Sequence, residues 1–152
     1  MSYSQKSSSL EQMRAEEKIF SLVEKTLGVK LEKNPKLFLA NNEYTYIQPD
    51  FYSADNCIIG EIFAHIGKPK KAQDNKIAND ILKMLLLEKI AKRSYRKIIV
   101  VCDEAEKKKL QGMSALSESI RQFGIEILNI QIDEQLRQEI LNAQERQRMT
   151  NA

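Results

Sequence analysis

Two carboxylate residues, Asp50 and Glu61, belong to a stretch in which two strand-like runs flank a short connection. In residues 44–50 and 61–66, successive side chains alternate between the two faces of a strand. If these runs pair as an antiparallel hairpin, Asp50 and Glu61 lie close together on one face. Two neighbouring carboxylates repel each other unless a cation joins them, and such oxygen ligands suit Mg²⁺ or Mn²⁺. The spacing therefore predicts a metal site of the kind that cleaves phosphodiesters.

The string Pro49-Asp50, then ten residues, then Glu61-x-Phe63 resembles the PD-(D/E)XK signature of restriction-endonuclease-like nucleases. Phe63 stands where that family has its lysine. The resemblance implies that Asp50 and Glu61 are catalytic residues that hold Mg²⁺ or Mn²⁺. It also implies that the substrate is a nucleic acid, with DNA the expected partner, and that the chain is an endonuclease.

The missing lysine needs a substitute, because hydrolysis requires a positioned, activated water. Lys76 is favoured: it lies on the helix predicted after the third strand and shares a helix face with Gln73. Lys68, Lys70 and His65 are the alternatives, just beyond the motif. Gln73 is a supporting candidate that could hold a water or a phosphate, although it could equally be an ordinary surface residue.

Two further candidates are supporting residues. Glu16 falls within the apolar stripe of the first helix, where a charge needs a partner. The resembled family often has an acidic first-helix residue beside its metal, which implies this role for Glu16; the alternative is a side chain that simply reaches water. His65, the only histidine, has a pKa suited to general-base chemistry or is a hydrogen-bonded edge residue. Zinc is not expected, because no His/Cys cluster has ligand spacing.

Charge is unevenly distributed along the chain. The net charge is +3, yet residues 68–97 contain ten basic and three acidic residues, which gives this segment +7 and leaves −4 for the rest. Such asymmetry favours a polyanionic partner, whereas a solvated lysine-rich helix face is the other interpretation. The candidates for binding nucleic acid are Lys68, Lys70, Lys71 and Lys83.

Length and composition indicate one domain. The 152 residues are 42% hydrophobic, enough for a real core. We expect a single restriction-endonuclease-like domain over residues 9–147, with a disordered tail at 1–8 and a C-terminal tail at 148–152. No apolar run approaches the roughly 20 residues that cross a bilayer, so a soluble, cytoplasmic protein without a membrane partner is expected. Cys57 and Cys102 are expected to be free thiols, and a homodimer is suggested by analogy.

The pattern of elements predicts an α/β fold with a mixed sheet of about five strands, in which an antiparallel meander is followed by a parallel crossover. This order also matches the core of the restriction-endonuclease-like fold. Helices are expected from Ser8 to Gly28 and over residues 71–91, 104–123 and 133–146. Strands are expected over residues 36–40, 44–50, 61–66, 97–104 and 124–132.

Two other classes of function stay open. The first is a catalytically inactive nuclease fold that binds DNA or a protein partner, for which Phe63 is the main evidence. The second is a nucleotide-binding α/β module, suggested by the strand end at residues 100–104. The chain contains no glycine-rich phosphate loop, which argues against the second class.

Overall fold

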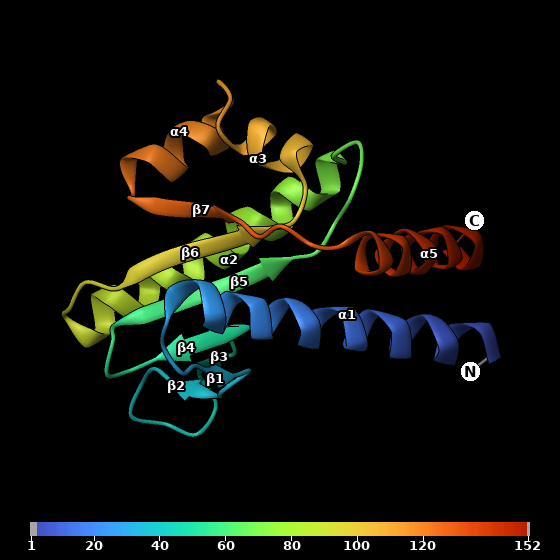
Figure 1. Ribbon diagram of the computed structural model, residues 1–152. Helices are drawn as coiled ribbons and strands as arrows, with labels where there is room; N and C mark the ends of the chain where they lie inside the picture. The colour runs from blue at the N-terminus through green and yellow to red at the C-terminus, as the bar shows by residue number, and fades with distance from the viewer. Residues whose placement is uncertain (1–2, 152) are drawn as a thin grey trace.

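Five strands form one mixed sheet with helices on both faces (Figure 1). The computed structural model describes residues 3–151, with the side chains of residues 10–149. The strands are β1 (Glu32–Lys33), β4 (Phe51–Ser53), β5 (Ile58–Phe63), β6 (Arg96–Val101) and β7 (Ile125–Asn129), and they lie in the order β1-β4-β5-β6-β7. β1, β4 and β5 are antiparallel neighbours, whereas β5, β6 and β7 run parallel. The predicted α/β class with a mixed, helix-flanked sheet is confirmed.

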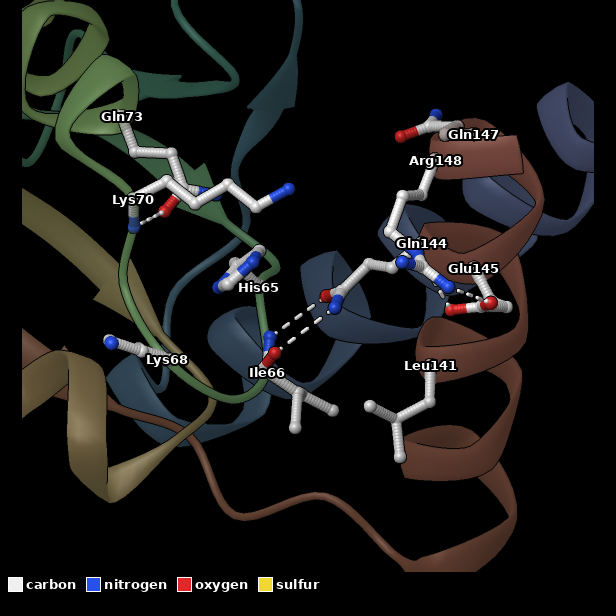
Figure 2. A pocket seen from close by; sticks show the side chains of 10 residues that line it. All are labelled: His65, Ile66, Lys68, Lys70, Gln73, Leu141, Gln144, Glu145, Gln147 and Arg148. Carbon is white, nitrogen blue, oxygen red and sulfur yellow. Dashed lines mark hydrogen bonds and ion pairs between the residues drawn. The ribbon is translucent and has the colours of Figure 1, made fainter. Parts of the chain in front are cut away.

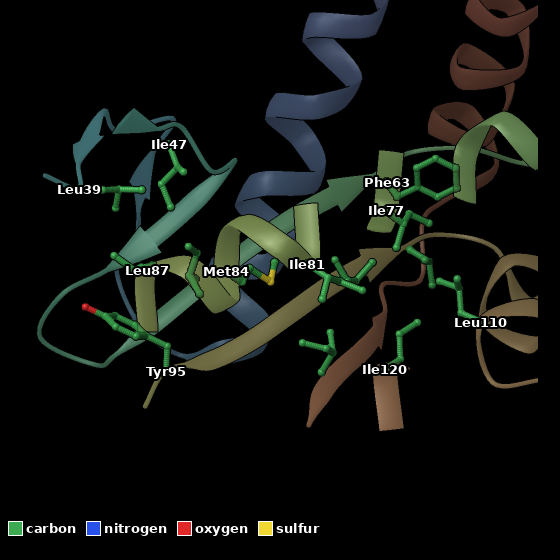
Figure 3. Close-up of a cluster of buried hydrophobic side chains, with 14 residues drawn as sticks. Leu39, Ile47, Phe63, Ile77, Ile81, Met84, Leu87, Tyr95, Leu110 and Ile120 are labelled. Atoms are coloured by element: carbon green, nitrogen blue, oxygen red, sulfur yellow. The ribbon is translucent and has the colours of Figure 1, made fainter. Parts of the chain in front are cut away.

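The helices divide between the two faces of the sheet. α1 (Tyr3–Leu27) and α5 (Glu134–Asn151) pack together over one face, where Ile19, Val23 and Ile140 are buried. α2 (Lys71–Ala91), α3 (Glu104–Leu110) and α4 (Ala115–Gln122) contribute to the core on the other face. Figure 3 shows this second core, in which Ile77 of α2 lies beside Phe63 of β5. Each face thus has its own apolar layer.

The central strands β5 and β6 are apolar on both faces because helices cover both. Ile58 belongs to the core under α1 and α5, while its neighbour Ile59 belongs to the core under α2. Gly60 pairs with Phe51 across the strands, and a Cβ at Gly60 would lie 1.9 Å from the Phe51 ring. Only glycine therefore fits at this position, directly before Glu61.

The meander differs from its prediction. The hairpin that carries the two carboxylates is formed by β4 and β5, joined by residues 54–57, so the strand expected at 44–50 lies too early and the one at 61–66 too late. β2 (Leu37–Phe38) and β3 (Tyr46–Ile47) form a separate two-stranded sheet. The third antiparallel strand is β1, which was not predicted. It consists of two exposed residues, too few to show an alternating pattern in the sequence.

Helix boundaries agree best where the stop signals are strong. α2 has the predicted bounds. It follows Gly67, whose φ is +94°, and Lys92, directly after its last residue, caps it in the left-handed conformation. The helix expected over 104–123 is two helices, because Ser114 caps a new one by accepting a hydrogen bond from Ser117 N at 3.1 Å.

Both terminal helices are longer than expected. α1 begins at Tyr3, within the stretch 1–8 predicted to be disordered, and residues 1–2 lie outside the described part of the chain. α5 continues to Asn151, through most of the expected tail at 148–152, and residue 152 is likewise outside. The two helices pack along each other, which extends both beyond their sequence signals. Among the described residues, no helix is long and apolar enough to cross a membrane.

Candidate active site

Asp50 and Glu61 lie opposite each other across the β4–β5 hairpin. Phe51 pairs with Gly60, so Asp50 and Glu61 occupy the next positions outward. Asp50 is close enough to Glu61 to raise its pKa, both by its charge and by a side-chain hydrogen bond. Asp50 is also fixed from behind, because its Oδ2 accepts a hydrogen bond from Ile62 N at 2.7 Å. The hairpin thus brings together the two carboxylates singled out in the sequence.

This pair is electrostatically strained. Burial under α2, the charge of Asp50 and the hydrogen bond with Asp50 raise the pKa of Glu61 from 4.5 to about 9. A proton shared between the two carboxyl groups relieves their repulsion. A divalent cation with oxygen ligands would relieve it equally well, and the donors are of the kind that Mg²⁺ and Mn²⁺ prefer. The two carboxylates therefore fit such an ion chemically.

Lys76 and Asp80 of α2 complete a cluster above Glu61. Lys76 Nζ lies 3.5 Å from Asp80 Oδ2, and the lysine charge lowers the pKa values of Glu61 and Asp80. Asp80 is itself buried, and burial raises its pKa. Lys76, the lysine favoured from the sequence, is thus paired with Asp80 and acts electrostatically on Glu61.

Glu16 approaches the same carboxylates from α1. Glu16 and Asp50 line one small hollow together with Phe20 and Lys33. Burial and the charge of Asp50 raise the pKa of Glu16. Glu16 also accepts a hydrogen bond from Gln12 Nε2 at 3.4 Å. Across the described residues, no three His, Cys, Asp or Glu side chains converge tightly enough to form a metal-binding group.

Phe63 occupies the position at which the resembled nucleases have a lysine. Its ring is buried against Ile77 in the core under α2 and lies 5.8 Å from the His65 ring at an interplanar angle of 24°. A lysine at position 63 would need to bury its ammonium in this apolar layer or pass out beneath α2. Lys76, whose side chain is largely exposed, pairs with Asp80 and acts on Glu61 by its charge instead.

Gln73 and His65 lie beyond the carboxylate cluster, where α2 begins. Gln73 Oε1 accepts a hydrogen bond from Lys70 N at 2.9 Å, so its side chain caps the helix. His65 Nδ1 is hydrogen-bonded to Glu106 Oε1 at 3.0 Å. Both residues line a groove of about 600 Å³ between the β5–α2 loop and α5 (Figure 2).

The four nucleic-acid-binding candidates are exposed at different distances from this groove. Lys68 and Lys70 line it, and Lys71 begins α2 beside it. Lys83 lies about three turns further along the helix. The +7 segment does not form one surface, because Lys97 at its far end is buried and paired with Glu88 at 2.8 Å.

Two residues of this region carried no prediction. Asp80 lies four residues after Lys76 on the same helix face. Its position among buried apolar residues of α2 could have indicated a buried acidic group. Glu106 is buried as the partner of His65, a contact across 41 residues that periodicity could not reveal. A scan against protein-family models, a search of the curated proteins and a search of the solved structures each found no match.

Proposed function

We propose that this protein is a metal-dependent nuclease that hydrolyses phosphodiester bonds in nucleic acid, with DNA as the expected substrate. The observation that carries the proposal is the position of Asp50 opposite Glu61 in the β4–β5 hairpin, where the charges of Asp50 and Lys76 both act on Glu61. Two like charges in contact destabilise the fold, and a bound cation would offset that cost. The resemblance to the PD-(D/E)XK nucleases points in the same direction.

Each residue has a role in this scheme. Asp50 and Glu61 would hold Mg²⁺ or Mn²⁺, and the chemistry supplied by the ion when bound is polarisation of a phosphoryl oxygen and activation of a water. Lys76 offsets the negative charge that develops on the phosphoryl group and orients the attacking water. Asp80 fixes the Lys76 ammonium by their ion pair, and Glu16 adds negative charge on the α1 side.

A catalytically inactive nuclease fold that binds nucleic acid or a protein partner is the second candidate. The burial of Phe63 in the core favours it, because the position that carries lysine in the resembled family carries no polar group here. Lys76 is what separates the two proposals. A homodimer would suit either, and sedimentation of the purified chain measures it.

The decisive experiment is cleavage of labelled DNA and RNA with Mg²⁺ or Mn²⁺ by wild type, Asp50→Ala and Lys76→Ala. Each variant should lose roughly 100-fold or more of the cleavage rate. Lys89→Ala is the matched control, since it removes an exposed lysine from the same helix far from the carboxylates. Absence of metal-dependent cleavage by wild type on every substrate would refute the enzyme and leave the binding module.

A further inference from the structure

We propose that the groove between the β5–α2 loop and α5 binds the phosphodiester backbone of a nucleic-acid strand as it leaves the carboxylate site. Its relation to a cleaved bond rests on the proposed function. The groove is open, and three of its lining residues are cations: Lys68 and Lys70 from the loop and Arg148 from α5 (Figure 2). Phosphate contacts of this kind supply most sequence-independent affinity for nucleic acid.

The lysine-bearing loop is rigidly held. Gln144 of α5 binds both backbone groups of Ile66: Oε1 accepts from Ile66 N at 2.9 Å, and Nε2 donates to Ile66 O at 3.0 Å (Figure 2). Asp103 Oδ2 accepts from Gly67 N at 2.9 Å, and Gln73 fixes Lys70 N. A loop pinned at both ends presents its lysines at low entropic cost on binding.

The ammonium groups of the two groove lysines are not engaged in ion pairs. In the described part of the chain, neither Lys68 nor Lys70 forms an ion pair, unlike Lys97 and Lys109, which are paired at 2.8 and 2.6 Å. Their charges are therefore available to a ligand. His65 also lines the groove. Its Nδ1 is hydrogen-bonded to Glu106, which leaves Nε2 as the ring nitrogen for a ligand.

Side chains of two helices link the groove to the carboxylate cluster. On α2, Gln73 lines the groove and Lys76, one turn on, reaches the cluster. On the other side, Gln147 lines the groove and donates a hydrogen bond to Gln12, which in turn donates to Glu16. A strand in the groove would therefore lie beside side chains that neighbour the Lys76 and Glu16 positions.

One anion opposes the groove cations. Glu145 Oε1 lies 2.6 Å from Arg148 Nη2, and both residues are mainly exposed. This pair holds Arg148 against its own helix rather than leaving it for a phosphate. Removing the Glu145 charge should therefore improve binding, an effect that misfolding cannot imitate.

The experiment measures fluorescence anisotropy of a labelled DNA duplex of about 20 base pairs in EDTA, on the Asp50→Asn background, across a salt series. Lys68→Glu/Lys70→Glu should weaken binding about tenfold and lower the salt slope by about two. Lys25→Glu/Lys30→Glu is the control with the same charge change, on exposed lysines near the end of α1. Because an acid is favourable at the N-terminus of α2, the Lys70 change should not unfold the helix.

Glu145→Gln should tighten binding about two- to fivefold, the size of an exposed ion pair. Glu118→Gln is its matched control, because Glu118 forms the same i,i+3 pair with Arg121 on α4 and should change binding little. Equal effects of both members of either matched set, or no binding by wild type at low salt, would overturn the proposal. Groove-dependent binding without cleavage refutes only the nuclease, whereas cleavage unaffected by the groove variants refutes only the groove.

Discussion

Two ionic clusters lie under the same helix, α2, and they are built in opposite ways. Near its C-terminal end, Lys97 Nζ is buried 2.8 Å from Glu88 Oε2 and also donates to Tyr95 O at 3.3 Å. Further toward its N-terminal end, Asp50 lies opposite Glu61 with like charge, and the nearby cation of α2, Lys76, is paired with Asp80. The first cluster satisfies its own charges, whereas the second leaves negative charge for a ligand to neutralise.

The largest expected effect comes from breaking the satisfied cluster. Glu88→Ala should lower the free energy of unfolding by about 3 kcal/mol, because it leaves the Lys97 ammonium buried without a counter-charge. It also removes the acceptor of Tyr95 N at 2.8 Å. Urea denaturation measures the change, and Glu88→Leu combined with Lys97→Met should recover much of the loss. A change below about 0.5 kcal/mol would mean that the two clusters are not opposites in stability.

Glu61→Gln should instead raise the free energy of unfolding, because it removes a carboxyl group whose ionisation the fold disfavours. The pKa of Glu61 is raised from 4.5 to about 9, so its contribution to stability is complete below pH 4.5 and is lost as the pH rises toward 9. The amide introduced by Glu61→Gln does not ionise, so the variant does not lose this stability as the pH rises. Without metal, the variant should gain on the order of 2 kcal/mol over wild type at pH 9 and little at pH 5.

Urea denaturation in EDTA at pH 5, 7 and 9 tests this difference. Glu126→Gln provides a control of opposite sign, because Arg96 lowers the pKa of Glu126. That carboxylate stabilises the fold above its ordinary pKa, so the variant should lose stability at neutral pH. An advantage of Glu61→Gln that is independent of pH would contradict the shared-proton description of the site.

A divalent ion should sharpen the contrast between the clusters. Mg²⁺ or Mn²⁺ at about ten times its dissociation constant should stabilise wild type by about 1.4 kcal/mol. Asp50→Asn should remove that gain, and Glu88→Ala should retain it despite its lower stability. Thermal unfolding with and without the ion measures both. Equal stabilisation of wild type and Asp50→Asn would place the ion elsewhere.

The smallest expected effect is on stability after Lys76→Ala. The Lys76 side chain is 58% exposed, and its pair with Asp80 is an i,i+4 helix contact, which is worth about 0.5 kcal/mol at most. The variant should therefore unfold almost as wild type does while it loses cleavage. A loss of stability as large as that of Glu88→Ala would show that Lys76 is a structural cation like Lys97.

The amino-acid sequence alone determined β6, β7 and α2, and it indicated that Asp50 and Glu61 belong to one hairpin. Apolar runs such as Ile98–Val101 can only be buried on both faces, and the glycine and proline around α2 fix where it begins. Asp50 and Glu61 could be expected on one face because alternation is a local property of any strand. The exact hairpin could not be placed, because its register depends on the Phe51 ring over Gly60.

Tertiary structure alone decided the rest of the site. Asp80 meets Glu61, and Glu16 meets Asp50, only because α2 and α1 pack on opposite faces at the same end of the hairpin. The groove needs Gln144 and Arg148 of α5, which lie more than 70 residues from Ile66. Such contacts depend on how whole helices pack, and no pattern within one helix or strand encodes the partner that it will meet.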